Sequence, residues 1–119
     1  MERDELEVLE LMRSVQRKYF PSCTRVSFCL YRDASVTGVA ARVKYGAYPE
    51  IDLYYNDLRV LEPDYRMGLV PVVAHELAHL IDPVDPDRIL AERLPTAMVA
   101  LWKELKEAGE AVCSMDAGA

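Results

Sequence analysis

Two spacings of apolar residues alternate along the chain and divide it into helical and extended parts. From residue 4 to 19 the apolar positions recur every three or four residues, with acids at the start and bases at the end, which predicts an amphipathic helix that Pro21 ends. Residues 25–31 instead alternate apolar and polar side chains and predict a strand. The β-branched and aromatic segments 36–45 and 51–55, separated by a turn-like sequence, predict two further strands that pair as a hairpin.

The second half of the chain has a predominantly helical pattern. A helix is expected over about residues 66–82, where uncharged residues predominate. A long C-terminal helix is predicted to start at Asp85, an N-cap acid followed by a proline and a second acid, and to stop at Gly109, with Pro95 as a kink. Small and polar residues from about 113 to 119 predict a flexible tail.

These elements predict one α+β domain over residues 1–119. It contains an N-terminal helix, a small, mostly antiparallel sheet of three or four strands with an exposed edge strand, a central helix and a long C-terminal helix. The length of 119 residues suits a single domain. With 51% apolar and 29% charged residues, the chain can bury an ordinary core without disulfides or a structural metal.

The net charge and the cysteines indicate which kinds of partner and which cell compartment to expect. The 14 basic and 20 acidic residues give a net charge of −6, which opposes binding to phosphate backbones and to anionic membranes. No apolar run reaches the ~20 residues of a spanning helix, and the acidic N-terminus does not resemble a signal peptide, so we expect a cytoplasmic protein. Cys23, Cys29 and Cys113 form no CxxC pair and are expected to be free thiols.

The sequence His75-Glu76-Leu77-Ala78-His79 is an HExxH motif within the predicted central helix. Residues four apart on a helix differ by about 40° in direction, so both imidazoles can converge on one metal ion. Glu76 is offset from them by about 100° and is better placed to act as a general base on a bound water. Both histidines of the chain are in this motif. The structural alternative is a pair of hydrogen-bonded core histidines beside an ion-paired glutamate.

This motif resembles the one that defines the zincin metallopeptidases, and the chain looks most like a compact, minimal gluzincin. The motif-level match covers residues 72–82, and a weaker likeness in the order of strands and helix extends over 25–82. The resemblance implies one Zn²⁺ per chain, with other first-row divalent metals possible. It also implies that the protein hydrolyses peptide bonds in short or unfolded peptides through a zinc-activated water, with Glu76 as general base.

The resemblance further implies that an edge strand holds the substrate by backbone pairing. Segment 48–55 would be this strand, and its substrate-binding residues would be Tyr48, Ile51, Leu53 and Tyr55. An ordinary sheet edge without a ligand is the alternative.

The third zinc ligand is expected to be an acid, because the chain has no further histidine. Glu92 on the following helix matches the gluzincin arrangement. Asp85 is the rival, since its distance from His79 resembles a metzincin-like pattern, although it is also explained as an N-cap. Asp82 could bind the metal or orient an imidazole. Cys113 could cap the zinc, because thiolates are good zinc ligands.

Several questions stay open at the level of sequence. A zincin-fold regulatory module that binds metal and partners is one alternative function, and a zinc hydrolase of a non-peptide amide is another. We expect a peptide or protein partner and neither nucleic acid nor membrane; the sequence does not indicate the oligomeric state. Candidates to stabilise the oxyanion are Tyr45, Tyr48, Tyr54, Tyr55, Tyr65 and Arg88.

Overall fold

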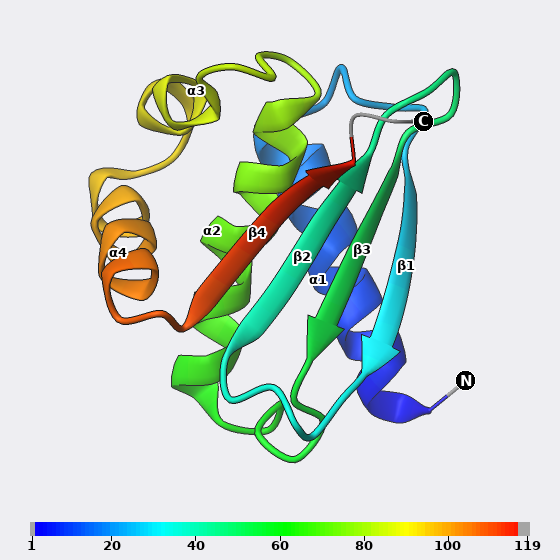
Figure 1. Ribbon diagram of the computed structural model, residues 1–119, viewed down its shortest axis with the longest axis vertical. Helices are drawn as coiled ribbons and strands as arrows, with labels where there is room; N and C mark the ends of the chain where they lie inside the picture. The colour runs from blue at the N-terminus through cyan, green and yellow to red at the C-terminus, as the bar shows by residue number, and fades with distance from the viewer. Residues whose placement is uncertain (1, 117–119) are drawn as a thin grey trace.

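The computed structural model describes residues 2–116, and for residues 114–116 it describes the backbone alone. In this range the chain forms an α+β fold of four helices and a four-stranded mixed sheet (Figure 1). The elements, in chain order, are α1 (Arg3–Tyr19), β1 (Ser27–Arg32), β2 (Val39–Lys44), β3 (Glu50–Tyr55), α2 (Pro63–His79), α3 (Pro86–Arg93), α4 (Thr96–Glu107) and β4 (Ala111–Asp116). No helix between residues 2 and 116 is long and apolar enough to cross a membrane.

The N-terminal helix and the hairpin agree with the sequence pattern. Helix α1 starts with a capping box between Glu2 and Glu5 and buries the apolar stripe of Val8, Met12 and Val15 against the sheet. Strands β2 and β3 pair antiparallel. Their alternate residues are buried on the face that α1 and α2 cover, as the ribbon shows (Figure 1).

The sheet differs from the expectation in the order of its strands. The order is β1-β3-β2-β4, and the outer pairs β1–β3 and β2–β4 are both parallel, so the sheet is mixed and not mostly antiparallel. β3 therefore lies inside the sheet, and the prediction that segment 48–55 forms an exposed edge strand is wrong. Ile51, Leu53 and Tyr55 are fully buried in the core, and Tyr48 precedes the strand with its side chain exposed.

The C-terminal part also departs from the predicted pattern. The long C-terminal helix is two helices, because the chain is extended at Leu94 and Pro95 between α3 and α4. Residues 113–116, expected in a flexible tail, form the second part of β4 at the edge of the sheet. Residues 117–119 lie outside the described part of the chain.

Two glycines determine where β4 begins. Gly109 has a φ of +71°, a left-handed conformation that favours glycine, and it turns the chain from α4 into β4. At Gly38 a Cβ would lie 1.9 Å from the carbonyl oxygen of Glu110, so the close approach of the two backbones requires a residue without a side chain. Val39 then donates a 2.8 Å backbone hydrogen bond to the same carbonyl. β4 is thereby joined to β2, next to α2.

Candidate metal centre

Helix α2 brings the two histidines of the HExxH motif together, as their spacing predicts. The Nε2 atoms of His75 and His79 are 3.0 Å apart, and both residues are buried, with 8% and 6% exposure. Two nitrogens that bind one tetrahedral zinc ion at about 2.0–2.1 Å are separated by about 3.3 Å. The observed spacing is therefore close to that of two ligands of a common ion.

His75 is held in its orientation by α3 and α4. Its ring stacks on Trp102 with 4.3 Å between the centroids, and its Nδ1 lies 3.3 Å from Oδ1 of Asp87. Asp87 in turn accepts hydrogen bonds from the Trp102 indole at 3.0 Å and from Lys106 at 2.9 Å. The Nδ1 atom has no hydrogen bond of normal geometry among the described residues, but the nearby carboxylate favours a proton on Nδ1 and so leaves Nε2 available to a metal.

Both imidazoles are held in the neutral form that metal binding needs. Burial, together with the neighbouring His79, lowers the pKa of His75 to about 4 in spite of Asp87. Burial also lowers the pKa of His79. At neutral pH the two rings are therefore uncharged and their free nitrogens can donate electron pairs.

Glu76 is the least satisfied polar side chain of the site. It is fully buried, and within residues 2–116 neither of its carboxylate oxygens has a hydrogen-bond partner of normal geometry. Burial raises its pKa to about 7, and the nearby Cys113 thiol opposes the shift only in part. A carboxyl group with this pKa can take up and release a proton near neutral pH, as a general base must.

Cys113 enters the site from β4. Its Sγ, a carboxylate oxygen of Glu76 and a ring nitrogen of His75 all lie within 4.8 Å of one another. In the sheet Cys113 is the register partner of Ala41, which is buried on the face that α2 covers. Burial, followed by the charge of Glu76, raises the pKa of the thiol. A residue assigned by sequence to a tail is thus part of the site.

The three acids proposed as third ligand contact a surface arginine. Arg88 forms 2.9 Å ion pairs with both Glu92 and Asp82. Asp85 caps α3 by accepting a 3.3 Å hydrogen bond from the Arg88 amide, and Asp82 also accepts hydrogen bonds from the amides of Val84 and Asp85. Among the described residues, none of the three acids forms an ion pair with His75 or His79.

Sequence reasoning missed Asp87 as a site residue. The sequence pattern explains Asp87 only as an acid in the first turn of a helix, two positions after the N-cap Asp85. Its contact with His75 depends on the packing of α3 and α4 against α2, to which no local pattern points.

Of the residues considered as stabilisers of the oxyanion, only Tyr45 contacts the HExxH motif through a hydrogen bond described in the structure. Tyr45 donates a 3.3 Å hydrogen bond to the backbone carbonyl of His79, and burial followed by the charge of Glu76 raises its pKa. It is therefore at the edge of the site. The others contact groups elsewhere or are exposed: Tyr48 is 79% exposed, Tyr54 stacks on Tyr31, Tyr55 bonds to Asp4, Tyr65 bonds to Gly38, and Arg88 pairs with Asp82 and Glu92.

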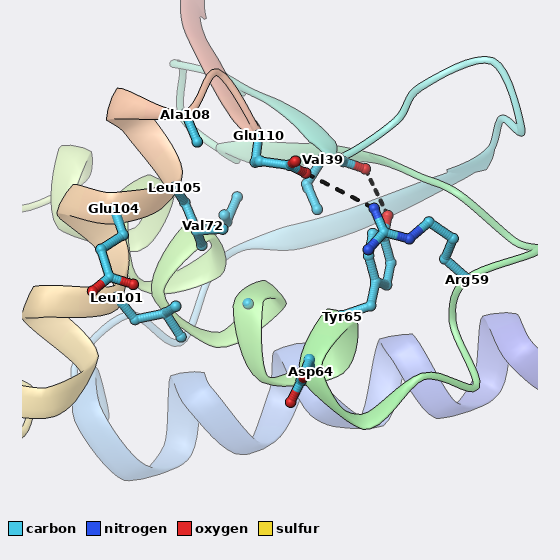
Figure 2. Close-up of a pocket in the computed structure, with 12 residues that line it drawn as sticks. Val39, Arg59, Asp64, Tyr65, Val72, Leu101, Glu104, Leu105, Ala108 and Glu110 are labelled. Carbon is cyan, nitrogen blue, oxygen red and sulfur yellow. Dashed lines mark hydrogen bonds and ion pairs between the residues drawn. The ribbon is translucent and has the colours of Figure 1, made fainter.

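A cavity of about 340 Å³ lies between the first part of α2, α4 and the start of β2, and the HExxH residues are not among those that line it (Figure 2). Gly68 and Val72 of α2, with Leu101 and Leu105 of α4, supply much of its apolar lining, and Val39 and Glu110 border it from the sheet. Gly68, Val72 and Glu76 follow one another at intervals of four, so they share one face of α2. Val72, the lining residue nearest to the motif in sequence, is one helical turn before Glu76.

Comparison with protein-family models, with curated proteins and with solved structures found no match.

Proposed function

We propose that the protein is a zincin-type, zinc-dependent metallopeptidase that cleaves short or unfolded peptides. One observation carries the proposal. His75 and His79 direct their Nε2 atoms to within 3.0 Å of each other, beside a fully buried glutamate whose oxygens have no hydrogen-bond partner of normal geometry within the described residues. A helix that served only to fill the core would leave these polar groups at a cost in free energy.

The donor set fits zinc. Two neutral imidazoles with converging nitrogens are ligands that zinc prefers, and the unpartnered carboxylate beside them is stabilised by a nearby cation. When bound, the metal would polarise a scissile carbonyl and lower the pKa of a water molecule.

The remaining chemistry belongs to the side chains. Glu76 would accept the proton of the attacking water and deliver it to the leaving amine, for which a pKa of about 7 is suitable. Asp87 would hold the ring of His75 in one orientation. Tyr45, at the C-terminal end of the motif, is the best placed of the oxyanion candidates.

We place an apolar side chain of the substrate in the cavity between α2 and α4, whose lining residue Val72 is one helical turn before Glu76. A cavity of roughly 150 Å³ holds a benzene molecule. The observed volume of about 340 Å³ therefore admits a large apolar side chain with adjoining backbone. The protein is negatively charged and has three free thiols, which is typical of proteins of the reducing cytoplasm. We therefore propose cytoplasmic peptides as its substrates.

One observation favours a second candidate, a metal-binding regulatory module. His75, Glu76 and His79 are each at most 8% exposed, and β4 lies close to Glu76, which would restrict access of a peptide. Such a module would bind metal without turnover.

Metal analysis and a glutamate variant test the two candidates. We expect about one zinc per chain in protein purified without added metal, lost in His79→Ala. Glu76→Gln should keep the zinc and lose hydrolysis of a mixed peptide library by about 1,000-fold or more. Full activity of Glu76→Gln would contradict the peptidase mechanism. Zinc without any hydrolysis in the wild type would favour the regulatory module.

A further inference from the structure

The third protein ligand of the candidate metal centre can be identified from the packing of β4 on α2. The Cys113 Sγ lies within 4.8 Å of a carboxylate oxygen of Glu76 and of a ring nitrogen of His75, whose Nε2 is 3.0 Å from that of His79; His79 itself is outside this group of three. The left-handed turn at Gly109 and the close contact at Gly38 bring the start of β4 against β2 and so place the thiol on this side of the sheet.

A second observation points to a cation at the same place. Glu76 is completely buried, and its two oxygens have no hydrogen-bond partner of normal geometry in the described part of the chain. A buried carboxylate without a counter-charge is costly. One divalent cation would balance one carboxylate and one thiolate next to two neutral imidazoles.

The carboxylates that could compete for the third position are held elsewhere. Glu92 and Asp82 form ion pairs with Arg88, and Asp85 caps α3. Asp87 approaches His75 at Nδ1, whereas the Nε2 of His75 faces His79. Because the two nitrogens point away from each other across the ring, Asp87 orients the ligand and does not share its metal.

We propose that Cys113 is the third protein ligand, with His75 and His79, of a thiophilic divalent metal ion such as Zn²⁺. The thiol gives up its proton on binding, as cysteine ligands do. The packing of β4 on α2 then completes the site, and Glu76 stays outside the ligand set. The inference rests on the metal site of the proposed function but not on peptidase activity.

Cobalt spectroscopy tests the ligand directly. Co²⁺ bound to a thiolate gives a sulfur-to-metal charge-transfer band in the near ultraviolet, which imidazole and carboxylate ligands do not give. We expect this band in the wild type and in the matched control Cys23→Ala, and its loss in Cys113→Ala and Cys113→Ser. Circular dichroism of the metal-free variants verifies that each is folded.

Zinc affinity, measured by competition with a chelator, gives a second readout. Loss of a direct ligand should weaken zinc binding by more than the 10–100-fold expected for an outer contact, so we expect about 100-fold or more for both Cys113 variants. No band in the wild type, or unchanged zinc affinity in folded Cys113→Ala and Cys113→Ser, would overturn the proposal. Loss of the band in Cys29→Ala alone would move the thiolate to a different site and overturn it as well.

The outcomes separate the ligand from the function. A Cys113-dependent band in a protein that hydrolyses no peptide would support the ligand assignment and contradict the peptidase. Hydrolysis that depends on Glu76, with zinc binding indifferent to Cys113, would support the peptidase and contradict the ligand assignment.

Discussion

Asp52 and Glu76 are both fully buried carboxyl groups, and the sheet places them in opposite environments. Asp52 is on the face of the sheet away from α2, where Arg42 pairs with it at 3.0 Å and Lys44 at 3.5 Å. Burial alone would raise the pKa of Asp52, but hydrogen bonds and these two cations hold it below its usual value. Among the described residues no cation forms an ion pair with Glu76, and burial raises its pKa to about 7.

A buried carboxylate that is already paired with cations, like Asp52, has a structural role. A buried carboxyl group without such a pair, like Glu76, can still bind a cation or a proton. Cys29, Glu50 and Asp52 also form a cluster with metal-ligand spacing. Its acids are already neutralised by Lys44 and Arg42, so a cation would gain little there. The cluster of His75, Glu76 and Cys113 offers an imidazole, a carboxylate and a thiol, and no cation among the described residues forms an ion pair with Glu76, which makes it the better metal site.

Replacing each buried acid by its neutral amide should change the free energy of unfolding in opposite directions. Glu76→Gln should stabilise the protein and Asp52→Asn should destabilise it, and the larger change is expected for Glu76→Gln. In the metal-free protein, between pH 4.5 and about pH 7 the folded state keeps a proton on Glu76 that the unfolded chain has released. Stability therefore falls as the pH rises through this window. Glu76→Gln removes this penalty and should be more stable than the wild type by up to about 3 kcal/mol above pH 7.

Urea unfolding of both proteins from about pH 4 to 8 measures the effect. His75, whose pKa is lowered to about 4 from 6.5, makes stability rise with pH up to about 6.5, but this contribution is common to both proteins and cancels to first order in their difference. A difference that does not grow with pH would mean that Glu76 is paired in solution.

Asp52→Asn should destabilise the protein by about 1–2 kcal/mol at neutral pH. Breaking a fully buried ion pair costs about 3–5 kcal/mol, but solvent screens Arg42 and Lys44, which are 38% and 37% exposed. Because the pKa of Asp52 is lowered, its contribution is present above the unfolded value of 3.8 and disappears as the pH falls through the folded value. Thermal unfolding near pH 7 and near pH 3 would reveal this; a variant as stable as the wild type at pH 7 would contradict the structural assignment.

Asp87→Asn should weaken zinc binding by about 10-fold, because the ring of His75 loses a charged orienting partner. Glu92→Gln is the matched control, since Glu92 is exposed and pairs with Arg88 alone among the described residues. Chelator competition distinguishes the two. Equal losses would indicate a general effect of surface charge, and a larger loss in Glu92→Gln would restore the sequence-based choice of third ligand.

The smallest effect is expected at Gly68, about two helical turns before Glu76 on α2. An added Cβ would make an ordinary 3.5 Å contact with Leu105, so Gly68→Ala should stabilise α2 by about 0.5–1 kcal/mol and leave the cavity open. Gly68→Leu should fill the cavity and raise KM for peptides with large apolar side chains. Calorimetry measures the stability of the Gly68→Ala and Gly68→Leu variants, and peptide kinetics measures their KM. Identical kinetics in both variants would exclude the cavity as the substrate site.

The sequence predicted the features that depend on neighbours in the chain. The amphipathic stripe from Val8 to Val15 predicted α1, and two β-branched and aromatic segments around a turn-like sequence predicted the β2–β3 hairpin. The spacing of His75 and His79 placed both imidazoles on one face of α2, because the helical repeat alone fixes their relative direction. The N-cap role of Asp85 was equally local, and it is confirmed.

Only the tertiary structure decided which distant segments meet. Strand order depends on crossover connections and shared packing faces, and no residue of segment 48–55 reveals that β1 and β2 will flank it. The contacts of Cys113 with Glu76 and of Asp87 with His75 join segments that are close only after β4, α3 and α4 have packed on α2. Periodicity determines an element and its buried face, whereas the partner of that face is chosen by the packing of the whole chain.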